Sequence, residues 1–230
     1  MFVIRALLVV LSTIWHGSIS LVQSFFDSTG RAQMATAQRW ARSLLRIGGV
    51  KVALDGIEKI RPDGSYVIAS NHLSYMDTPV ILANIPVQFR FLAKRGLFQI
   101  PFLGTHLARA GHIPVPRQDP RAAVKTMALA AETIRNRGIS MLVFPEGGRS
   151  HDGVLRPFKE GAAYIGIKAG VPIVPIALVG TRAVLPFGSG HIRPGKVTLR
   201  IGDPIETAGL SLRDRGAVIE RIREQISAML

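Results

Sequence analysis

The chain of 230 residues contains no cysteine, which excludes disulfide bonds, a thiolate nucleophile and a cysteine-ligated zinc site. Aromatic residues are scarce, at 7%, and 15 acidic residues stand against 29 basic ones, so the net charge is +14. Such an excess favours polyanionic partners: nucleic acid, anionic lipid headgroups or an acidic carrier protein. Few aromatics and no recognisable binding motif argue against nucleic acid. The length predicts one domain plus an appendage.

The segment from Asn71 to Asp77 pairs the imidazole of His72 with a carboxylate five residues later. A carboxylate that holds one ring nitrogen leaves the other free to act as a general base. Two other interpretations stay open. His72 could be a structural histidine bonded to the backbone. Ser74-x-x-Asp77 also fits a capping box, in which case one oxygen of Asp77 could serve the helix and the other His72.

A second segment, Phe-Pro-Glu-Gly-Gly-Arg-Ser, covers residues 144–150. Gly147 and Gly148 beside Arg149 allow backbone amides and a guanidinium fork to close on phosphate or carboxylate oxygens. Glu146 has two interpretations, a substrate contact or a loop organiser that accepts backbone amides. Lys94 follows one predicted strand and is a further candidate phosphate ligand.

These two segments occur in order with two others, Gly111 to Arg117 and Val171 to Ile176. Together the four resemble the motifs of the glycerolipid acyltransferase superfamily, whose marks are His-x4-Asp and a Phe-Pro-Glu-Gly-x-Arg-Ser block. Within it, the chain is similar to the bacterial 1-acylglycerol-3-phosphate acyltransferases. The resemblance covers roughly residues 53–179. Gly148 departs from it, because the family most often has threonine there.

The resemblance implies transfer of a fatty acyl group from acyl-carrier protein or acyl-CoA to the sn-2 hydroxyl of 1-acylglycerol 3-phosphate (lysophosphatidic acid), giving phosphatidic acid. His72 is then the general base and Asp77 its orienting partner. The candidate substrate-binding residues are Glu146, Gly147, Gly148, Arg149, Lys94 and Arg117. We expect direct transfer without an acyl-enzyme, because cysteine and a Gly-x-Ser-x-Gly elbow are lacking. We expect no cofactor and no metal, because the six histidines lack ligand spacing.

Two alternative functions stay open at this point. The chain could be an acyltransferase of the same family that acts on another lyso-lipid, such as a lyso-ornithine lipid. It could also be a non-catalytic basic membrane adaptor that has kept the fold. The presence of His72, Asp77, Glu146 and Arg149 together argues against the adaptor.

Residues 2–22 are almost wholly apolar, interrupted by Arg5 and His16. As a helix, these 21 residues would span about 30 Å, the thickness of a bilayer core. They predict a membrane helix. A signal peptide is the competing interpretation, although no small-x-small cleavage site follows.

Residues 31–47 predict a basic amphipathic helix, with Arg31, Arg39, Arg42 and Arg46 opposite its apolar side. We interpret it as an interfacial helix on an anionic membrane surface; the alternative is a surface helix packed on the core. Glycines 48 and 49 end it and divide a membrane anchor, 1–48, from an acyltransferase domain, 49–230. The first helix could span the membrane, or both could dip into one leaflet. With the resemblance, this predicts the cell inner membrane, with the catalytic domain on its cytoplasmic face.

After residue 49, strands and helices alternate, which predicts a layered α/β fold with an active site at the strand ends. The resemblance implies a mixed sheet with flanking helices, as in glycerol-3-phosphate acyltransferases. The predicted strands span residues 65–70, 89–93, 112–115, 140–144, 173–179 and 197–201. The predicted helices span residues 75–84, 120–137 and 212–230, and residues 187–195 form a loop. Asp119 is an N-cap and Gly138 ends the same helix.

Overall fold

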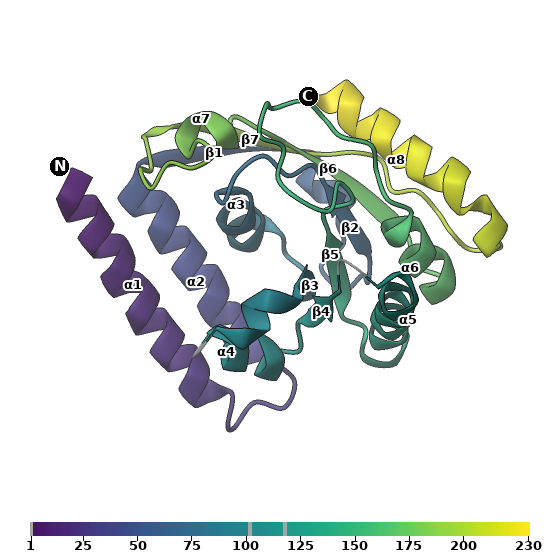
Figure 1. Cartoon of the computed structure of the whole chain (residues 1–230), viewed down its shortest axis with the longest axis horizontal. Coiled ribbons are helices and arrows are strands. Elements are labelled where there is room, and N and C mark those ends of the chain that lie inside the picture. The colour runs from purple at the N-terminus through teal and green to yellow at the C-terminus, as the bar shows by residue number, and fades with distance from the viewer. Residues whose placement is uncertain (1, 101–102, 117–118) are drawn as a thin grey trace.

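The computed structural model of the chain describes residues 2–100, 103–116 and 119–230 (Figure 1). In this part, seven strands form one sheet in the order β1-β7-β6-β2-β5-β3-β4. The strands are β1 (Val50–Asp55), β2 (Val67–Ser70), β3 (Phe89–Lys94), β4 (Ile113–Val115), β5 (Ser140–Val143), β6 (Ile173–Val179) and β7 (Gly195–Ile201). Strands β6, β2, β5, β3 and β4 are mutually parallel, whereas β7 runs antiparallel to β6. The mixed sheet is as predicted.

The helices flank both faces of this sheet (Figure 1). They are α1 (Phe2–Gln23), α2 (Arg31–Gly48), α3 (Asp77–Asn84), α4 (Leu103–Arg109), α5 (Pro120–Arg137), α6 (Gly161–Ala169), α7 (Thr181–Val184) and α8 (Arg215–Met229). Three 3₁₀ turns, η1 (Ile57–Lys59), η2 (Arg95–Gln99) and η3 (Leu212–Asp214), complete the described elements. The predicted strands are confirmed, with ends that differ by two residues at most.

Strand alternation divides the core into two layers around the central strand β2. Ile68 points to the layer built with α2 and α3, whereas Val67 and Ala69 point to the layer built with α5, α6 and α8. All three side chains are fully buried, as expected for a parallel strand covered on both faces. Strand β2 is therefore a rigid support for the residues that follow it.

Local signals in the sequence predicted some elements and missed others. The side chain of Asp119 accepts the N–H of Ala122 at 3.0 Å, and Gly138 ends α5 with a φ of 62°. Ser211 and Asp214 form a capping box at the start of the predicted C-terminal helix, although the first turn there is 3₁₀. Strand β1 was not predicted, because only its first residue is buried and it shows no apolar run. Helices α4, α6 and α7 were not predicted either, since none exceeds nine residues.

The apolar side of α2 packs on the core and does not face lipid, which corrects our interfacial interpretation. Met34, Ala41 and Leu45 are buried in the layer that α2 shares with α3. The arginines on the opposite side, Arg39 and Arg42 among them, are exposed. A helical period shows that one side of a helix is apolar; what covers that side is decided by the rest of the fold.

Helix α1 runs antiparallel beside α2 and leaves its outer side uncovered (Figure 1). The hydroxyl groups of Ser12 and Ser43 lie 2.5 Å apart, and Trp40 Nε1 donates to Thr13 Oγ1 at 3.1 Å. On the outer side, Trp15 is 67% exposed, and the segment is long and apolar enough to cross a membrane. This helix therefore presents an apolar surface that lipid can cover.

Candidate active site

The strand register brings the two sequence motifs together. Strands β2 and β5 are parallel neighbours with Ala69 opposite Val143, so the residues that follow each strand meet at one edge of the sheet. There the backbone N–H of His72 donates to Glu146 Oε1 at 2.7 Å, and the N–H of Ser150 donates to the carbonyl of His72 at 2.8 Å. The second motif therefore holds the backbone of His72 from both sides.

Asn71 ties the same loop to the strand on the other side of β2. Its side-chain amide donates to the carbonyl of Leu178 at 3.0 Å, and the N–H of Leu178 donates back to Asn71 Oδ1 at 2.8 Å. Asn71 is fully buried. The loop that carries His72 is thus fixed to both neighbouring strands, β5 and β6.

A buried carboxylate orients the imidazole of His72. Asp77 Oδ2 lies 2.7 Å from His72 Nδ1 and also accepts the N–H groups of Leu73 and Ser74 at 2.7 and 2.8 Å. Asp77 is 0% exposed. A buried carboxylate bonded to Nδ1 keeps the ring proton there and leaves Nε2 as the acceptor.

Asp77 holds His72 and also accepts the N–H of Ser74, as a capping box requires. The box is not completed, because Ser74 Oγ donates to the carbonyl of Leu185 and α3 begins at Asp77 with no side-chain cap. Oδ2 accepts the ring and the backbone amides ahead of α3, whereas Oδ1 has no hydrogen-bond partner among the residues that the structure describes. The division that we considered, with one oxygen for the helix and the other for His72, is therefore not present. The tight turn from His72 to Asp77 brings the amides and the ring to the same side of the carboxylate.

Phe144, which we did not predict as a site residue, supports the other face of the imidazole. The two rings are stacked, with centroids 3.9 Å apart and planes 15° apart. The His72 side chain is 17% exposed, so one edge of it can be reached from solvent. Phe144 directly follows strand β5, and that position in the second motif was the available signal.

Glu146 accepts backbone amides with both carboxylate oxygens. Of the two interpretations that we considered for it, a substrate contact or a loop organiser, these bonds fit the loop organiser. In addition to the bond from His72, Oε2 accepts the N–H of Arg156 at 3.0 Å. Glu146 is 7% exposed. Burial raises the pKa of its carboxyl group, and the hydrogen bonds from Arg156 and His72 oppose that shift. Removal from water is the dominant effect.

The guanidinium of Arg149 lies between two aromatic rings. Its Cζ is 3.5 Å from the ring centroid of Tyr75 and 4.5 Å from that of Phe187. Among the described residues, Arg149 has no carboxylate partner within ion-pair distance. Aromatic faces attract a cation without neutralising it, so Arg149 is oriented and keeps its full charge for an anion. Neither ring was in our predicted site, and only Tyr75 lies within a predicted motif.

The other predicted residues are placed as follows. Gly147 has a φ of 73°, in the left-handed region that favours glycine. Gly148 lies beside it with a half-buried backbone. Lys94 is exposed at the end of β3, with β5 between it and β2. Arg117 lies outside the described residues.

Comparison with known proteins gives the family of this chain. Residues 51–179 match the family model described as Acyltransferase. The chain is 40% identical to a chloroplastic 1-acyl-sn-glycerol-3-phosphate acyltransferase of Brassica napus over 67% of this chain and 45% of that protein. It is 31% identical to the human 1-acyl-sn-glycerol-3-phosphate acyltransferase alpha over 77% of this chain and 63% of that protein. The chain thus spans about half the length of its Brassica and Arabidopsis relatives.

The fold is similar to that of a solved structure. The 1-acyl-sn-glycerophosphate (LPA) acyltransferase PlsC from Thermotoga maritima superposes with a TM-score of 0.80 and 28% identity. The superposition covers 99% of this chain and 95% of that chain. With a family match over more than half of its residues, this chain belongs to the acyltransferase family, as the four motifs indicated.

Proposed function

We propose that this protein is a 1-acylglycerol-3-phosphate O-acyltransferase, which transfers a fatty acyl group to the sn-2 hydroxyl of lysophosphatidic acid and forms phosphatidic acid. The observation that carries the proposal is the hydrogen bond of 2.7 Å between His72 Nδ1 and Asp77 Oδ2, with Arg149 stacked on Tyr75 of the same loop. The Brassica, human and Thermotoga relatives are named as acyltransferases of 1-acylglycerol 3-phosphate, which supports the same acceptor.

In the proposed reaction, His72 acts first as a base and then as an acid. Nε2 takes the proton of the acceptor hydroxyl while its oxygen attacks the carbonyl carbon of the thioester donor. The tetrahedral intermediate collapses, the carbon–sulfur bond breaks, and the imidazolium returns the proton to the leaving thiolate. Asp77 stabilises the imidazolium and fixes its tautomer. Phe144 restricts the rotation of the ring.

Arg149 is the proposed ligand of the acceptor phosphate. The guanidinium plane is held by Tyr75 and Phe187, and Tyr75 belongs to the same short loop as His72. Phosphate held there would keep the sn-2 hydroxyl close to the imidazole, which makes the attack effectively intramolecular. Gly147, Gly148 and Lys94 are proposed to add amide and ammonium contacts, and Glu146 acts by positioning His72.

The proposed donor is acylated acyl-carrier protein or acyl-CoA, both of which are anionic thioesters. The net charge of +14 suits either one.

We further propose that α1 lies along the membrane and does not cross it alone. Helix α1 is bonded to α2 through Ser12 and Thr13 and to α4 through Ser20, whose hydroxyl lies 3.1 Å from Nδ1 of His106. Since α2 packs into the core, α1 remains on the side of the domain. Residues 1–48 would attach the enzyme to the cytoplasmic face of the inner membrane, with residues 49–230 as the acyltransferase domain.

An acylation assay of the purified chain tests the proposed function. Lysophosphatidic acid should be acylated in preference to lyso-ornithine lipid and to monoacylglycerol, with acyl-carrier protein and acyl-CoA offered as separate donors. His72→Ala serves as the blank. Preference for another lyso-lipid would keep the reaction class and change the acceptor, whereas wild-type activity equal to the blank would contradict the proposal.

A further inference from the structure

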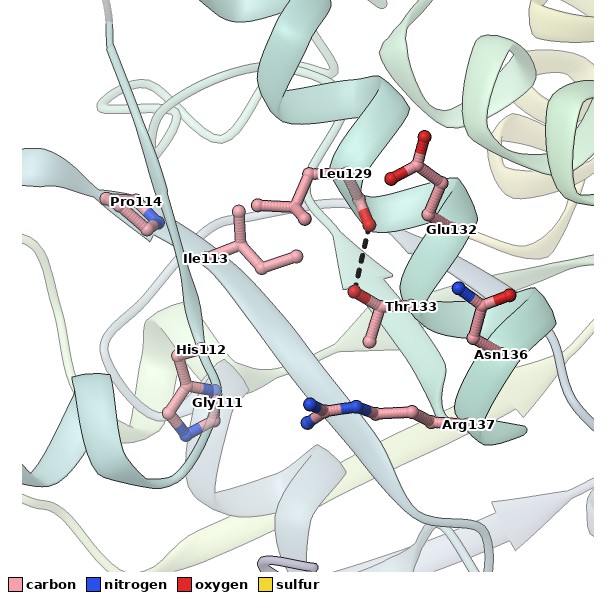
Figure 2. Close-up of a pocket in the computed structure, with 9 residues that line it drawn as sticks. All are labelled: Gly111, His112, Ile113, Pro114, Leu129, Glu132, Thr133, Asn136 and Arg137. Carbon is pink, nitrogen blue, oxygen red and sulfur yellow. Dashed lines mark hydrogen bonds between the residues drawn. The ribbon is translucent and has the colours of Figure 1, made fainter.

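A cavity of about 350 Å³ lies between β4 and α5, and none of the residues around His72 lines it (Figure 2). A smaller recess of about 30 Å³, with room for about one water molecule, adjoins this cavity. Gly111, Thr133 and Arg137 line both spaces. Figure 2 shows the guanidinium of Arg137 extended toward Gly111, while the carboxylate of Glu132 points away from it. The turn between α1 and α2 lines the recess with residues 28–30.

Three arginines from separate elements line the recess: Arg90 of β3, Arg109 of α4 and Arg137 at the end of α5. In the described part of the chain, none of the three has a carboxylate within ion-pair distance. Asp27 is close enough to attract Arg90, but its oxygens accept backbone N–H groups at the start of α2. Positive charge is therefore in excess at this point.

Arg90 is the buried member of the group, at 2% exposure. Its terminal nitrogens donate to the carbonyls of Phe89 at 2.9 Å and Thr29 at 3.0 Å, and to Gln88 Oε1 at 3.2 Å. Its Nε–H has no acceptor among the described residues. Burial lowers the pKa of Arg90, the charge of Asp27 raises it, and the neighbouring Arg137 lowers it further. A buried charge paired only with neutral acceptors is costly, and a bound anion would relieve that cost.

We propose that Arg90, Arg109 and Arg137 form a second anion site, which binds a phosphate group and is separate from the acceptor site at Arg149. The exposed Arg137 supplies a planar fork that matches phosphate oxygens, and Arg90 supplies a fixed charge beneath it. Arg109 adds a second exposed charge, although its Nε and Nη2 also donate to the hydroxyl and carbonyl of Ser24 at 2.8 and 3.3 Å. The body of the phosphate occupies the larger cavity, and one oxygen reaches the recess.

The phosphate can come from a lipid headgroup or from solution, and its position makes both sources available. The neighbouring turn exposes Phe25 by 64% and Phe26 by 87%, and Arg109 lies 4.1 Å from the ring centroid of Phe25. Exposed phenylalanines beside arginines are suited to the boundary between acyl chains and headgroups. The site thus lies beside the turn between α1 and α2, within reach of headgroups in the attachment that we propose.

Phosphate binding by the full chain in neutral detergent tests the second site. Sodium phosphate is titrated by calorimetry against sodium chloride of equal ionic strength, in an Arg149→Gln background that removes the proposed acceptor ligand. We expect this protein to bind phosphate, and a further Arg137→Gln or Arg109→Gln change to weaken binding about ten- to hundredfold. Arg135→Gln is the matched control, because Arg135 is exposed in the same last turn of α5 and does not line the recess.

Two results of the phosphate titration would count against the second site. Loss of all phosphate binding in the Arg149→Gln protein, or equal binding in the Arg137→Gln and Arg135→Gln proteins, would overturn the second site. Because the acceptor ligand is already absent, either result leaves the acyltransferase proposal intact.

A vesicle experiment then identifies the source of the phosphate. Binding to phosphatidylcholine vesicles with and without phosphatidylglycerol is measured for the Arg137→Gln and Arg135→Gln proteins. If the ligand is a headgroup, Arg137→Gln should weaken binding to the anionic vesicles more than Arg135→Gln does, and sodium phosphate should compete. Equal vesicle binding assigns the site to soluble phosphate.

Discussion

The backbone N–H of His72 donates to Glu146 Oε1 at 2.7 Å and so joins two motifs that lie 74 residues apart in the chain. The imidazole is held by its own motif through Asp77, while its backbone is held by the other motif. A catalytic base needs both kinds of support, because a shift of the backbone moves the ring as surely as a rotation of the side chain.

The pair of His72 and Asp77 can be tested by a change that conserves shape. Asp77→Asn keeps the buried volume but favours the wrong tautomer of the imidazole; the corresponding change in a serine-protease triad lowers kcat about 10⁴-fold. We expect turnover to fall at least about a hundredfold, with a smaller effect on KM. His72→Ala should abolish turnover. Near-normal activity in folded His72→Ala protein would sink the assignment of the base.

Glu146 should act through the backbone and should also affect stability as a function of pH. In Glu146→Gln, the side-chain amide nitrogen faces one of the two backbone N–H groups, so His72 should shift and kcat should fall while KM for the acceptor changes little. Burial raises the pKa of Glu146 above 4.5, so the folded state binds the proton more tightly than the unfolded state. The stability that this provides is full below pH 4.5 and is lost as pH rises through the raised value.

The pH dependence is read from thermal unfolding of the wild-type and Glu146→Gln proteins between about pH 4 and pH 7. Relative to the variant, the wild type should lose stability as pH rises. If the difference in stability between the wild type and Glu146→Gln were constant over this pH range, the carboxyl group of Glu146 would titrate alike in the folded and unfolded states.

Recognition of the acceptor phosphate by Arg149 should depend on the two aromatic rings that hold its guanidinium. Arg149→Lys loses the planar fork, and we expect discrimination between lysophosphatidic acid and monoacylglycerol to shrink about ten- to hundredfold. Tyr75→Leu should shift discrimination the same way by a smaller factor, whereas Tyr75→Phe, the control, keeps the ring and should behave as wild type. If Arg149→Lys instead raised only the KM of the donor, Arg149 would belong to the donor side of the site.

His112 should make the fold sensitive to acid. Its Nδ1 accepts the N–H of Phe91 at 3.0 Å, and burial, then Arg90, then His106 lower the pKa of His112 from 6.5 to about 3. The folded pKa is depressed, so this stability is present above pH 6.5 and is lost as pH falls toward 3, at up to about 1.4 kcal/mol per pH unit. His112→Asn should show a shallower loss of stability over this window in urea unfolding; an equal slope would contradict the assignment.

Membrane attachment through α1 can be tested with paired substitutions. Leu11 on α1 and Val124 on α5 are 52% and 53% exposed, so a glutamate at either place costs the fold about the same. Leu11→Glu should release the protein from vesicles, because a charge then faces the acyl chains, and Val124→Glu should leave binding unchanged. Equal sedimentation of the two variants with vesicles would mean that another surface carries the attachment.

The sequence by itself determined the order of the motifs, six of the strands and the capped helix α5. These features are local: alternation, caps and glycines act over a few neighbouring residues. The same local information placed His72 and Asp77 together, because a turn of five residues can bring them into contact.

Only the tertiary structure decided which elements cover the apolar side of each helix and which groups the side chains of the motifs contact. The apolar side of α2 is covered by α3 and the sheet, and Glu146 and Phe144 reach His72 because β2 and β5 are parallel neighbours in a particular register. Phe187 comes to Arg149 from a loop outside the motifs. Such contacts depend on which strands pair and how the layers pack, and those choices are made by the whole chain at once and not by any one segment.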